Sequence, residues 1–370
     1  SDSDGGTDHT QVDLSPDDLP GEGTDSDPYE ISNVSELQAM EDDLDGSYEL
    51  VSDIDASDTA QFNDGRGFDP IGEAGFPFSV ASFRGSLDGN GHTITHLTIE
   101  RPGEDNVGLF RSIEGSVTDI AVSDVRIIGG NVTGSIVGFN LGSVQRSSAT
   151  GVVTGHTRVG GLAGDNNGEL NGGVIQQSYT NVTVHGVKTV GGIAGRSGNG
   201  GTIASVYAVG PVNGSSSVGG LTGGGFGTAA VTHSYFDTQA TGQTTSDKSA
   251  IKLTTAQMQG QAAAENMDGF DFENTWTTTS EYPALRVLSE TDEGSGSGGG
   301  DPIEVDVDPS DLSGDGSESN PYEISNVSEL QAMEDDLDAN YEVVSDIDAS
   351  ETTQFNDGAG FDPIGSENTP

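Results

Sequence analysis

The segment Val159-Gly160-Gly161-Leu162-Ala163-Gly164 returns, slightly changed, as Val190-Gly191-Gly192-Ile193-Ala194-Gly195 and as Val218-Gly219-Gly220-Leu221-Thr222-Gly223. A period of roughly thirty residues indicates stacked units, each of which buries its apolar face on a neighbour. Residues that recur at this period are expected to form interior ladders, with successive strands about 4.8 Å apart. The three expected ladders are Leu109, Ile136, Leu162, Ile193, Leu221; then Val117, Val144, Ile175, Ile203, Val231; and last Ile120, Ser147, Ser178, Val206, Ser234.

Paired glycines in the three hexapeptides are expected at corners, where the backbone bends or takes positive φ. The hexapeptides resemble the GLUG motif (Gly-Leu-hydrophobic-Gly), which occurs in surface proteins of bacteria and archaea, including large adhesins and non-catalytic regions of surface peptidases. The resemblance covers about residues 28–287, although the early repeats at 107–110 and 135–138 depart from the motif. It implies an all-β fold, a right-handed parallel β-helix (β-solenoid), on a cell surface, and it implies no reaction.

A longer repeat encloses the short one, because Pro28–Gly72 returns as Pro321–Gly365 with only six differing pairs. This divides the chain into an acidic linker with an edge strand (1–27), a GLUG-type β-solenoid domain with capped ends (28–288), a Gly/Ser/Asp linker (289–320) and a partial second copy (321–370). Half a domain cannot close its core. Either the array continues, or the partial copy completes a domain of another subunit and joins subunits head to tail.

Both ends of the solenoid domain contain residues that are expected to cap it. A short helix is predicted at 35–44 with Ser35 as its N-cap, followed by a strand over 48–54. The turn Asp88-Gly89-Asn90-Gly91 predicts a hairpin or a corner. At the other end, a helix that begins at Thr254 and the bulky residues of 270–285 are expected to plug the coil, since an open edge would polymerise.

The large negative net charge of the chain predicts that it works in a salt-rich environment. It has 61 acidic and 12 basic residues, a formal charge of −49. Repulsion of this size opposes compaction in dilute buffer, and salt relieves it because the Debye length falls to about 3 Å at 1 M. The composition therefore predicts a halophilic microbe, and with the resemblance a halophilic archaeal type. A nucleic-acid partner is excluded, because phosphate binding needs a basic stripe.

Other composition features narrow the function further. The chain has no cysteine, which excludes disulfides, a thiolate nucleophile and Cys-based metal sites. No stretch approaches the roughly 20 apolar residues of a membrane helix, so no membrane insertion is expected. No signal peptide precedes Ser1, and the chain is expected to be a mature, soluble segment whose anchor lies outside it.

Asn-x-Ser/Thr sequons are candidate glycosylation sites, and their use would place the protein outside the cell. Polar, Thr-rich chains also produce this tripeptide by chance, which is the alternative interpretation. The sequons are at Asn33, Asn131, Asn181, Asn213 and Asn326.

A catalytic site is not predicted. Glycoside hydrolysis needs two carboxylates about 5–10 Å apart across a groove. Between 130 and 236 the acidic residues are Asp165 and Glu169, both expected as solvated loop carboxylates. The histidines are scattered, and His92 and His96 would lie some 13 Å apart along a strand, too far to share a metal. The basic residues of the same segment are spread over three repeats and form no cluster: Arg146, Arg158, Lys188 and Arg196.

The second linker contains the candidate metal and self-assembly residues. Carboxylates at loop spacing, with glycine between them, suit calcium, and a plain acidic linker is the alternative. No other cofactor is expected. Apolar residues that alternate with polar ones could add as an edge strand to a neighbouring sheet. The calcium candidates are Asp306, Asp308, Asp311 and Asp315, and the self-assembly candidates are Val305, Val307, Tyr322 and Ile324.

The segment 130–236 carries two acidic against four basic residues, whereas the caps and linkers carry nearly all of the negative charge. We expect part of this wall to be covered by a neighbouring subunit, a neighbouring repeat or glycan; an exposed Thr/Ser/Gly wall is the alternative. These features predict an extracellular structural or adhesive protein, a tandem-repeat subunit of a surface filament, stalk or fibrous adhesin. Its expected partner is itself, head to tail or laterally, and then surface glycans or other cells. The alternatives are a carbohydrate-binding or carbohydrate-cleaving β-helix and a stalk that displays a peptidase.

Overall fold

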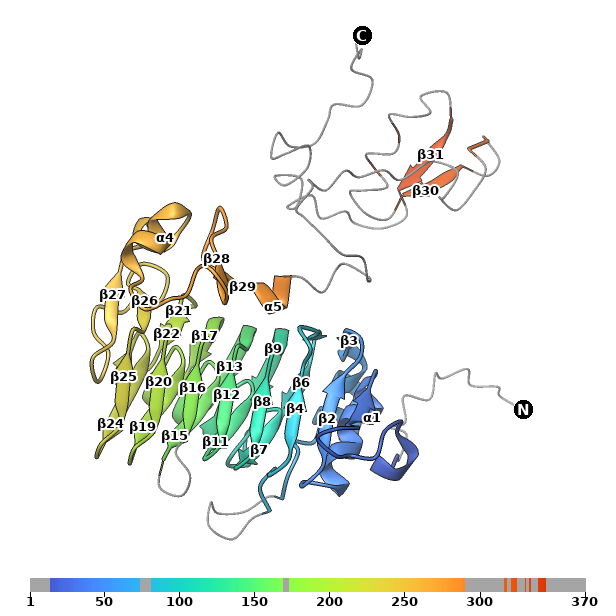
Figure 1. Ribbon diagram of the computed structural model, residues 1–370, viewed down its shortest axis with the longest axis horizontal. Helices are drawn as coiled ribbons and strands as arrows, with labels where there is room; N and C mark the ends of the chain where they lie inside the picture. The colour runs from blue at the N-terminus through green and yellow to red at the C-terminus, as the bar shows by residue number, and fades with distance from the viewer. Residues whose placement is uncertain are drawn as a thin grey trace. The chain divides into compact units, whose positions relative to one another are not determined.

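The computed structural model describes residues 14–73, 81–168 and 173–289, and in the C-terminal part 316–317, 321–324, 330, 333 and 339–343. The chain divides into two compact units, Ser1–Gly294 and Ser295–Pro370. In the first unit, successive turns of chain stack along one axis and form a β-solenoid of about five turns (Figure 1). The predicted β-solenoid is therefore confirmed.

Each complete turn adds one strand to each of four parallel sheets, met in the same order along the chain. The first sheet runs β1 (Tyr29–Ile31), β2 (Ser47–Leu50), β4 (Ser86–Asp88), β8 (Ser116–Thr118), β12 (Ser143–Gln145), β16 (Val174–Gln176), β20 (Thr202–Ala204), β25 (Ala230–Thr232). The second contains β3 (Ile54–Asp55), β5 (Thr93–Thr95), β6 (Thr98–Glu100), β9 (Ala121–Ile128), β13 (Ser148–Thr154), β17 (Tyr179–His185), β21 (Tyr207–Ala208), β22 (Val212–Asn213), β26 (Tyr235–Asp237), β27 (Ile251–Leu253). The third has β10 (Asn131–Thr133), β14 (Thr157–Gly160), β18 (Lys188–Gly191), β23 (Ser216–Gly219), and the fourth β7 (Phe110–Ile113), β11 (Val137–Asn140), β15 (Ala163–Asn167), β19 (Ala194–Gly198), β24 (Thr222–Phe226).

The interior of the coil is built from the ladders that the sequence predicted. In the first sheet, Val117, Val144, Ile175, Ile203 and Val231 are direct Cα partners. All members of the other two ladders are fully buried. The serines of the third ladder fit inside because each hydroxyl donates to a backbone oxygen, as Ser147 does to Gln145 and Ser178 to Gln176.

The paired glycines lie at corners of the coil, as the sequence predicted. None of the six has positive φ among the described residues. They are needed because backbones approach closely: a Cβ at Gly161 would lie 2.0 Å from the oxygen of Gly192, and one at Gly192 2.3 Å from that of Gly220. Residues other than glycine take the left-handed positions at the corner between the first and second sheets, among them Arg146, Gln177 and Ser205. Gly161, Gly192 and Gly220 lie in the bends between the third and fourth sheets, so the expected bend is found at these glycines and the alternative, positive φ, is not.

The N-terminal end is more ordered than the sequence predicted. Residues 14–27, expected as linker, pack on β1 and β2: Leu19 joins the core, and the 3-10 helix η1 (Pro16–Asp18) precedes it. Helix α1 (Val34–Ala39) is capped by Asn33, not Ser35, because the Asn33 side chain accepts from the amides of residues 35 and 36. Further short elements are the 3-10 helices η2 (Met40–Asp42) and η3 (Ser57–Gln61) and helix α2 (Phe62–Gly65).

At this end, the structure corrects one strand prediction and decides between two alternatives for a turn. The strand predicted over 48–54 is divided into β2 and β3, which belong to different sheets. The turn at 88–91 is a corner and not a hairpin, because β4 before it and β5 after it also lie in different sheets. Both results follow from the coil, which turns from the first sheet to the second at these points.

The aromatic segment near the C-terminus covers a side of the solenoid instead of plugging its end. Tyr179, Tyr207 and Tyr235 stack on the outside of the second sheet, and Phe270 and Trp276 pack on them. The open edge is instead met by 241–253, where Thr245 accepts from the amide of Gly220. This cover contains α3 (Thr255–Met258), α4 (Gln261–Asn266), β28 (Trp276–Thr277), β29 (Ala284–Leu285) and α5 (Arg286–Ser289), which run back along the stack (Figure 1).

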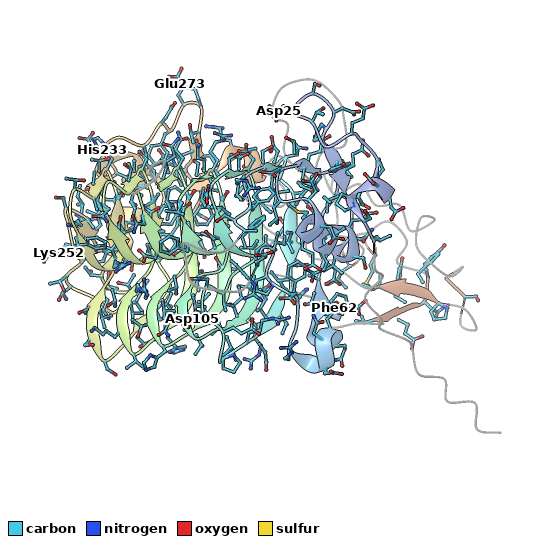
Figure 2. All side chains as sticks on the ribbon, turned by 90° about the horizontal axis from the view of Figure 1, so that it is seen from below. Asp25, Phe62, Asp105, His233, Lys252 and Glu273 are labelled. Atoms are coloured by element: carbon cyan, nitrogen blue, oxygen red, sulfur yellow. The ribbon has the colours of Figure 1, made fainter. Side chains whose placement is uncertain are left out.

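Helix α3 begins as predicted, with Thr254 as its N-cap in a capping box with Gln257. Figure 2 places Lys252 of β27 at the C-terminal end of the stack and Glu273 on a loop that stands out from its side. Among the described residues, no helix has the length and hydrophobicity needed to cross a membrane.

The described part of the second unit contains two short strands, β30 (Tyr322–Ile324) and β31 (Tyr341–Val343). They pair in parallel with the register of β1 and β2, Tyr322 opposite Tyr341 and Ile324 opposite Val343. The long sequence repeat is thus also a structural repeat at these strands.

Candidate functional site on the outer wall of the solenoid

Asp165 was expected as a solvated loop carboxylate, and that expectation was wrong. It lies on β15 with no exposed surface, although its side chain points away from the interior ladders. Arg158 of β14 donates to Asp165 Oδ2 over 2.9 Å, and Arg196 of β19 donates through Nε to Oδ1 over 3.1 Å and through Nη2 to Oδ2. Both oxygens of this carboxylate are thus occupied by charge-assisted hydrogen bonds from the two arginines. Glu169 lies outside the described residues.

Sequence reasoning missed this cluster, although the repeat register contains it. Asp165 and Arg196 each lie three residues after a member of the first ladder, Leu162 and Ile193. The ladder alone therefore places them opposite each other on neighbouring strands, as the structure shows. Arg158 lies within β14 of the third sheet, with a left-handed φ of 57°, and its side chain reaches the same carboxylate across the bend that joins β14 to β15.

Next to Arg196, the last strand of the fourth sheet forms a glycine-rich platform. The guanidinium carbon of Arg196 lies 4.8 Å from the ring centroid of Phe226, a cation–π contact, and Phe226 is 39% exposed. A Cβ at Gly225 would lie 2.4 Å from Lys248 Cε and 2.6 Å from Asp247 Oδ2, so both side chains cross this glycine. Oδ2 of Asp247 is buried and has no hydrogen-bond partner in the structure. This platform combines cations, an aromatic ring and a free acceptor.

A second charged cluster lies near the N-terminal end. Arg111 donates to Asp69 over 2.8 Å and to Glu104 over 2.9 Å, and Arg101 donates to Glu104 over 3.2 Å. Both arginine side chains are almost fully buried. Burial opposes ionisation of Glu104, but the bond from Arg111 and the charge of Arg101 outweigh it, and the pKa of Glu104 lies below its usual value. The cluster holds the first turns together and offers no unpaired carboxylate for catalysis.

The two histidines of the first turns each pair with an aspartate. His92 Nδ1 lies 3.2 Å from Asp53 Oδ1, and His96 Nδ1 lies 3.3 Å from Asp55 Oδ1. They serve separate pairs and not one site. Within the described ranges, no group of three or more His, Asp or Glu side chains is placed to hold a metal ion. The calcium candidates Asp306, Asp308, Asp311 and Asp315 lie outside these ranges.

The remaining predicted sites are distributed over the surface. Asn33, Asn181 and Asn213 are exposed, whereas Asn131 is half-buried and its amide donates to Asp105 over 3.0 Å. Asn326 lies outside the described residues, as do the self-assembly candidates Val305 and Val307. Tyr322 and Ile324 are in β30, and Ile324 is fully buried there. Use of the sequons and of these strands in assembly stays a prediction.

Comparison with known proteins gives a relative and a fold. No family model matches the chain, so the resemblance to GLUG repeats stays a prediction. Over 165 residues, 43% of its length, the chain is 41% identical to halomucin of Haloquadratum walsbyi, and the match spans 2% of halomucin. Over 136 residues, 35% of its length, it is 32% identical to a "putative Gly-rich membrane protein" of Evansella cellulosilytica and spans 15% of that protein. The chain thus spans a small part of both relatives.

Among solved structures, a "putative immunoglobulin A1 protease" of Bacteroides ovatus superposes with a TM-score of 0.56, over 72% of this chain and 94% of that one. The two are 21% identical, so the likeness shows the fold alone. It agrees with the β-solenoid described above and assigns no reaction to this chain.

Proposed function

We propose that this chain is an extracellular structural or adhesive protein of a halophilic microbe, a repeating part of a surface filament, stalk or fibrous adhesin. The observation that carries the proposal is the unbroken first sheet, in which each strand from β1 to β25 pairs in parallel with the next. Such a stack creates length and surface without a cleft. The core residues pack against the neighbouring turns of the coil. The two carboxylate clusters described above, at Asp165 and at Glu104, are bound to arginines.

The similarity to halomucin supports a salt-rich setting. The matched part is 2% of halomucin, so that relative is far longer than one solenoid domain. Length of this kind suits a protein made of many consecutive domains. The long repeat of this chain, seen again in β30 and β31, supports the same arrangement here. A formal charge of −49 keeps such an array soluble in brine.

The surface location is tested by immunogold labelling of intact and permeabilised cells with antibodies against residues 28–288. Gold on intact cells, along filaments or on the cell envelope, is the expected result. Gold that appears only after permeabilisation would contradict the proposal. Pre-immune serum and cells lacking the gene serve as controls.

We also propose that the chain associates with itself through the second unit. Val343 at the end of β31 is 58% exposed, whereas its counterpart Leu50 is completely buried. An exposed apolar side chain on a strand is a place for packing and pairing with another chain. Light scattering in molar salt compares residues 1–294 with residues 1–370. A larger mass per chain for 1–370 supports association, and one subunit in both cases removes it.

Carbohydrate binding is the second candidate function, and the platform beside Arg196 and Phe226 favours it. Carbohydrate cleavage has less support, because the Asp165 cluster and the Asp69–Glu104 cluster are already paired with arginines. A reducing-sugar assay on neutral and acidic polysaccharides separates the two: release of sugar would establish cleavage and overturn the purely structural proposal.

A further inference from the structure

We propose that the glycine-rich platform at the end of the fourth sheet binds an acidic sugar, a pyranose ring that bears a carboxylate. The platform consists of Arg196, Gly225, Phe226, Asp247 and Lys248. This inference rests on the proposed function in one respect, since it names the class of ligand that an adhesive protein would hold. Binding itself can be measured whether or not the chain forms filaments.

The first argument is the local charge. The chain as a whole is strongly acidic, yet around the platform the cations prevail. Asp165 is buried between Arg158 and Arg196. These two guanidinium groups and one carboxylate together carry a net charge of +1. Lys248 and Asp247 lie beside the same glycine and offset each other, so the surplus stays at one positive charge. An acidic protein has no need for such a patch in order to be soluble, so the patch points to an anionic ligand.

In brine, this charge can act only through direct contact. The Debye length is about 3 Å at 1 M salt, so long-range attraction is screened. Charge-assisted hydrogen bonds from a planar guanidinium survive screening, because donor and acceptor touch. Arg196 is suited to this role: Asp165 fixes one edge of the guanidinium and Phe226 supports its face, so little side-chain entropy is lost when a carboxylate binds.

The second argument is the shape and chemistry of the platform. Glycine at 224 and 225 keeps the strand free of side chains, and the ring of Phe226 stands beside it, 39% exposed. Sugars present an apolar face that packs on aromatic rings and hydroxyl groups that donate hydrogen bonds. Oδ2 of Asp247 has no hydrogen-bond partner but is buried, so a sugar hydroxyl reaches it only when the Asp247 side chain turns outward.

An acidic peptide, such as the linker of another copy of this chain, would also seek the cations. The platform fits it less well, because a peptide of Asp and Gly has no apolar face to pack on the exposed Phe226 ring. A shallow platform of this kind gives weak binding at one site, and repetition of the domain along an array would raise the avidity.

The test is isothermal titration of the full chain in molar potassium chloride with oligogalacturonate. The matched probes are its methyl ester, which lacks the charge, and an oligomer of glutamate, which lacks the sugar. We expect saturable binding of oligogalacturonate, at least tenfold weaker binding of the ester, and no binding of the peptide. Equal binding of ester and acid, equal or tighter binding of the peptide, or no binding of oligogalacturonate would each overturn the proposal.

Variants locate the site. Phe226→Ala removes the exposed ring and Lys248→Gln removes a cation of the platform, and both leave the Asp165 ion pairs in place. Each should weaken binding about tenfold, a loss of about 1.4 kcal/mol. Arg126→Gln is the matched control, because Arg126 is also exposed and paired with one carboxylate, Glu100, but lies on the second sheet. Unchanged binding in both platform variants, or an equal loss in the control, would overturn the site. Immunogold labelling is independent of all these outcomes and still decides the surface location.

Discussion

Two regions of the molecule have almost the same sequence and the same local structure but very different burial. In the first unit, β1 and β2 pair Tyr29 with Tyr48 at 5.3 Å between ring centroids, and in the second, β30 and β31 pair Tyr322 with Tyr341 at 5.6 Å. Beyond β2 comes β4, with Leu87 opposite Tyr48. Among the described residues, the sheet of the second unit consists of β30 and β31. Leu50 accordingly has no exposed surface, and its counterpart Val343 is 58% exposed.

The difference shows which part of the fold is local. Pairing of the two strands needs only the repeated sequence itself. Ile31 and Ile324 on the first strand are fully buried in both units, whereas burial of side chains on the second strand needs the next turn, which supplies the other side of each ladder. Stability of a solenoid turn is therefore a property of the stack, and the same residue should matter in one unit and not in the other.

The largest effect is expected for Tyr48→Ala compared with Tyr341→Ala. Tyr48 is almost fully buried against Tyr29 and Phe83, so its loss should cost about 3–5 kcal/mol of unfolding free energy. Tyr341→Ala should leave the first unit unchanged. Denaturant unfolding in molar salt measures both, with the single tryptophan, Trp276, as a reporter inside the first unit. Equal losses in the two variants would refute the distinction.

Acid should weaken the first unit through Glu104, which lies outside the repeated segment. Its pKa is lowered in the folded protein, so its contribution is present above the unfolded value of about 4.3 and is lost as pH falls through the folded value. At neutral pH, Glu104→Gln should cost about 1.5–3 kcal/mol, since charged hydrogen bonds are lost. The difference between the variant and the unaltered chain should shrink below pH 4. A difference that is constant with pH would show that the charge has no role.

A smaller effect is expected for Leu50→Val, which gives the first unit the residue of the second. Removal of one buried methylene should cost about 1 kcal/mol. The reverse change, Val343→Leu, should have no effect on the first unit, because the position is exposed. Chemical denaturation of both variants checks this, and a measurable loss for Val343→Leu would show that the second unit has a closed core in solution.

The smallest effect is expected for Arg66→Ala, another position at which the two copies differ. Arg66 Nη1 lies 3.5 Å from Glu104 and is more than half exposed. Exposed ion pairs contribute less than about 1 kcal/mol, and salt screens them further. The melting temperature in low and high salt tests this. A loss that grows with salt would contradict the assignment of a screened surface pair.

Much of the fold could be predicted from sequence, because the residues that form one interior ladder recur at regular intervals along the chain. Val144 and Ile175 could be placed opposite each other from their positions alone. The corner at 88–91 could not be separated from a hairpin, since both use the same turn residues. The site was missed for another reason: Asp165 was considered as a single residue of a loop, and only the register of Leu162 and Ile193 joins it to Arg196.

The aromatic cover was misplaced because composition identifies bulky residues without saying where they pack. Phe270 and Trp276 were expected at an open edge, but Tyr179 and Tyr207 present their rings on the side of the second sheet. The repeated tyrosines, 28 residues apart, were visible in the sequence and were the signal for a lateral cover. Long-range packing of this kind depends on two distant segments at once.

Amide hydrogen exchange on the full chain in molar salt tests the stacking account most directly. The amides of Val117, Val144, Ile175 and Ile203 should exchange together, only through unfolding of the whole first unit, whereas those of 341–343 should exchange orders of magnitude faster. Equal protection of 341–343 and 48–50, or independent exchange of neighbouring turns, would contradict the account.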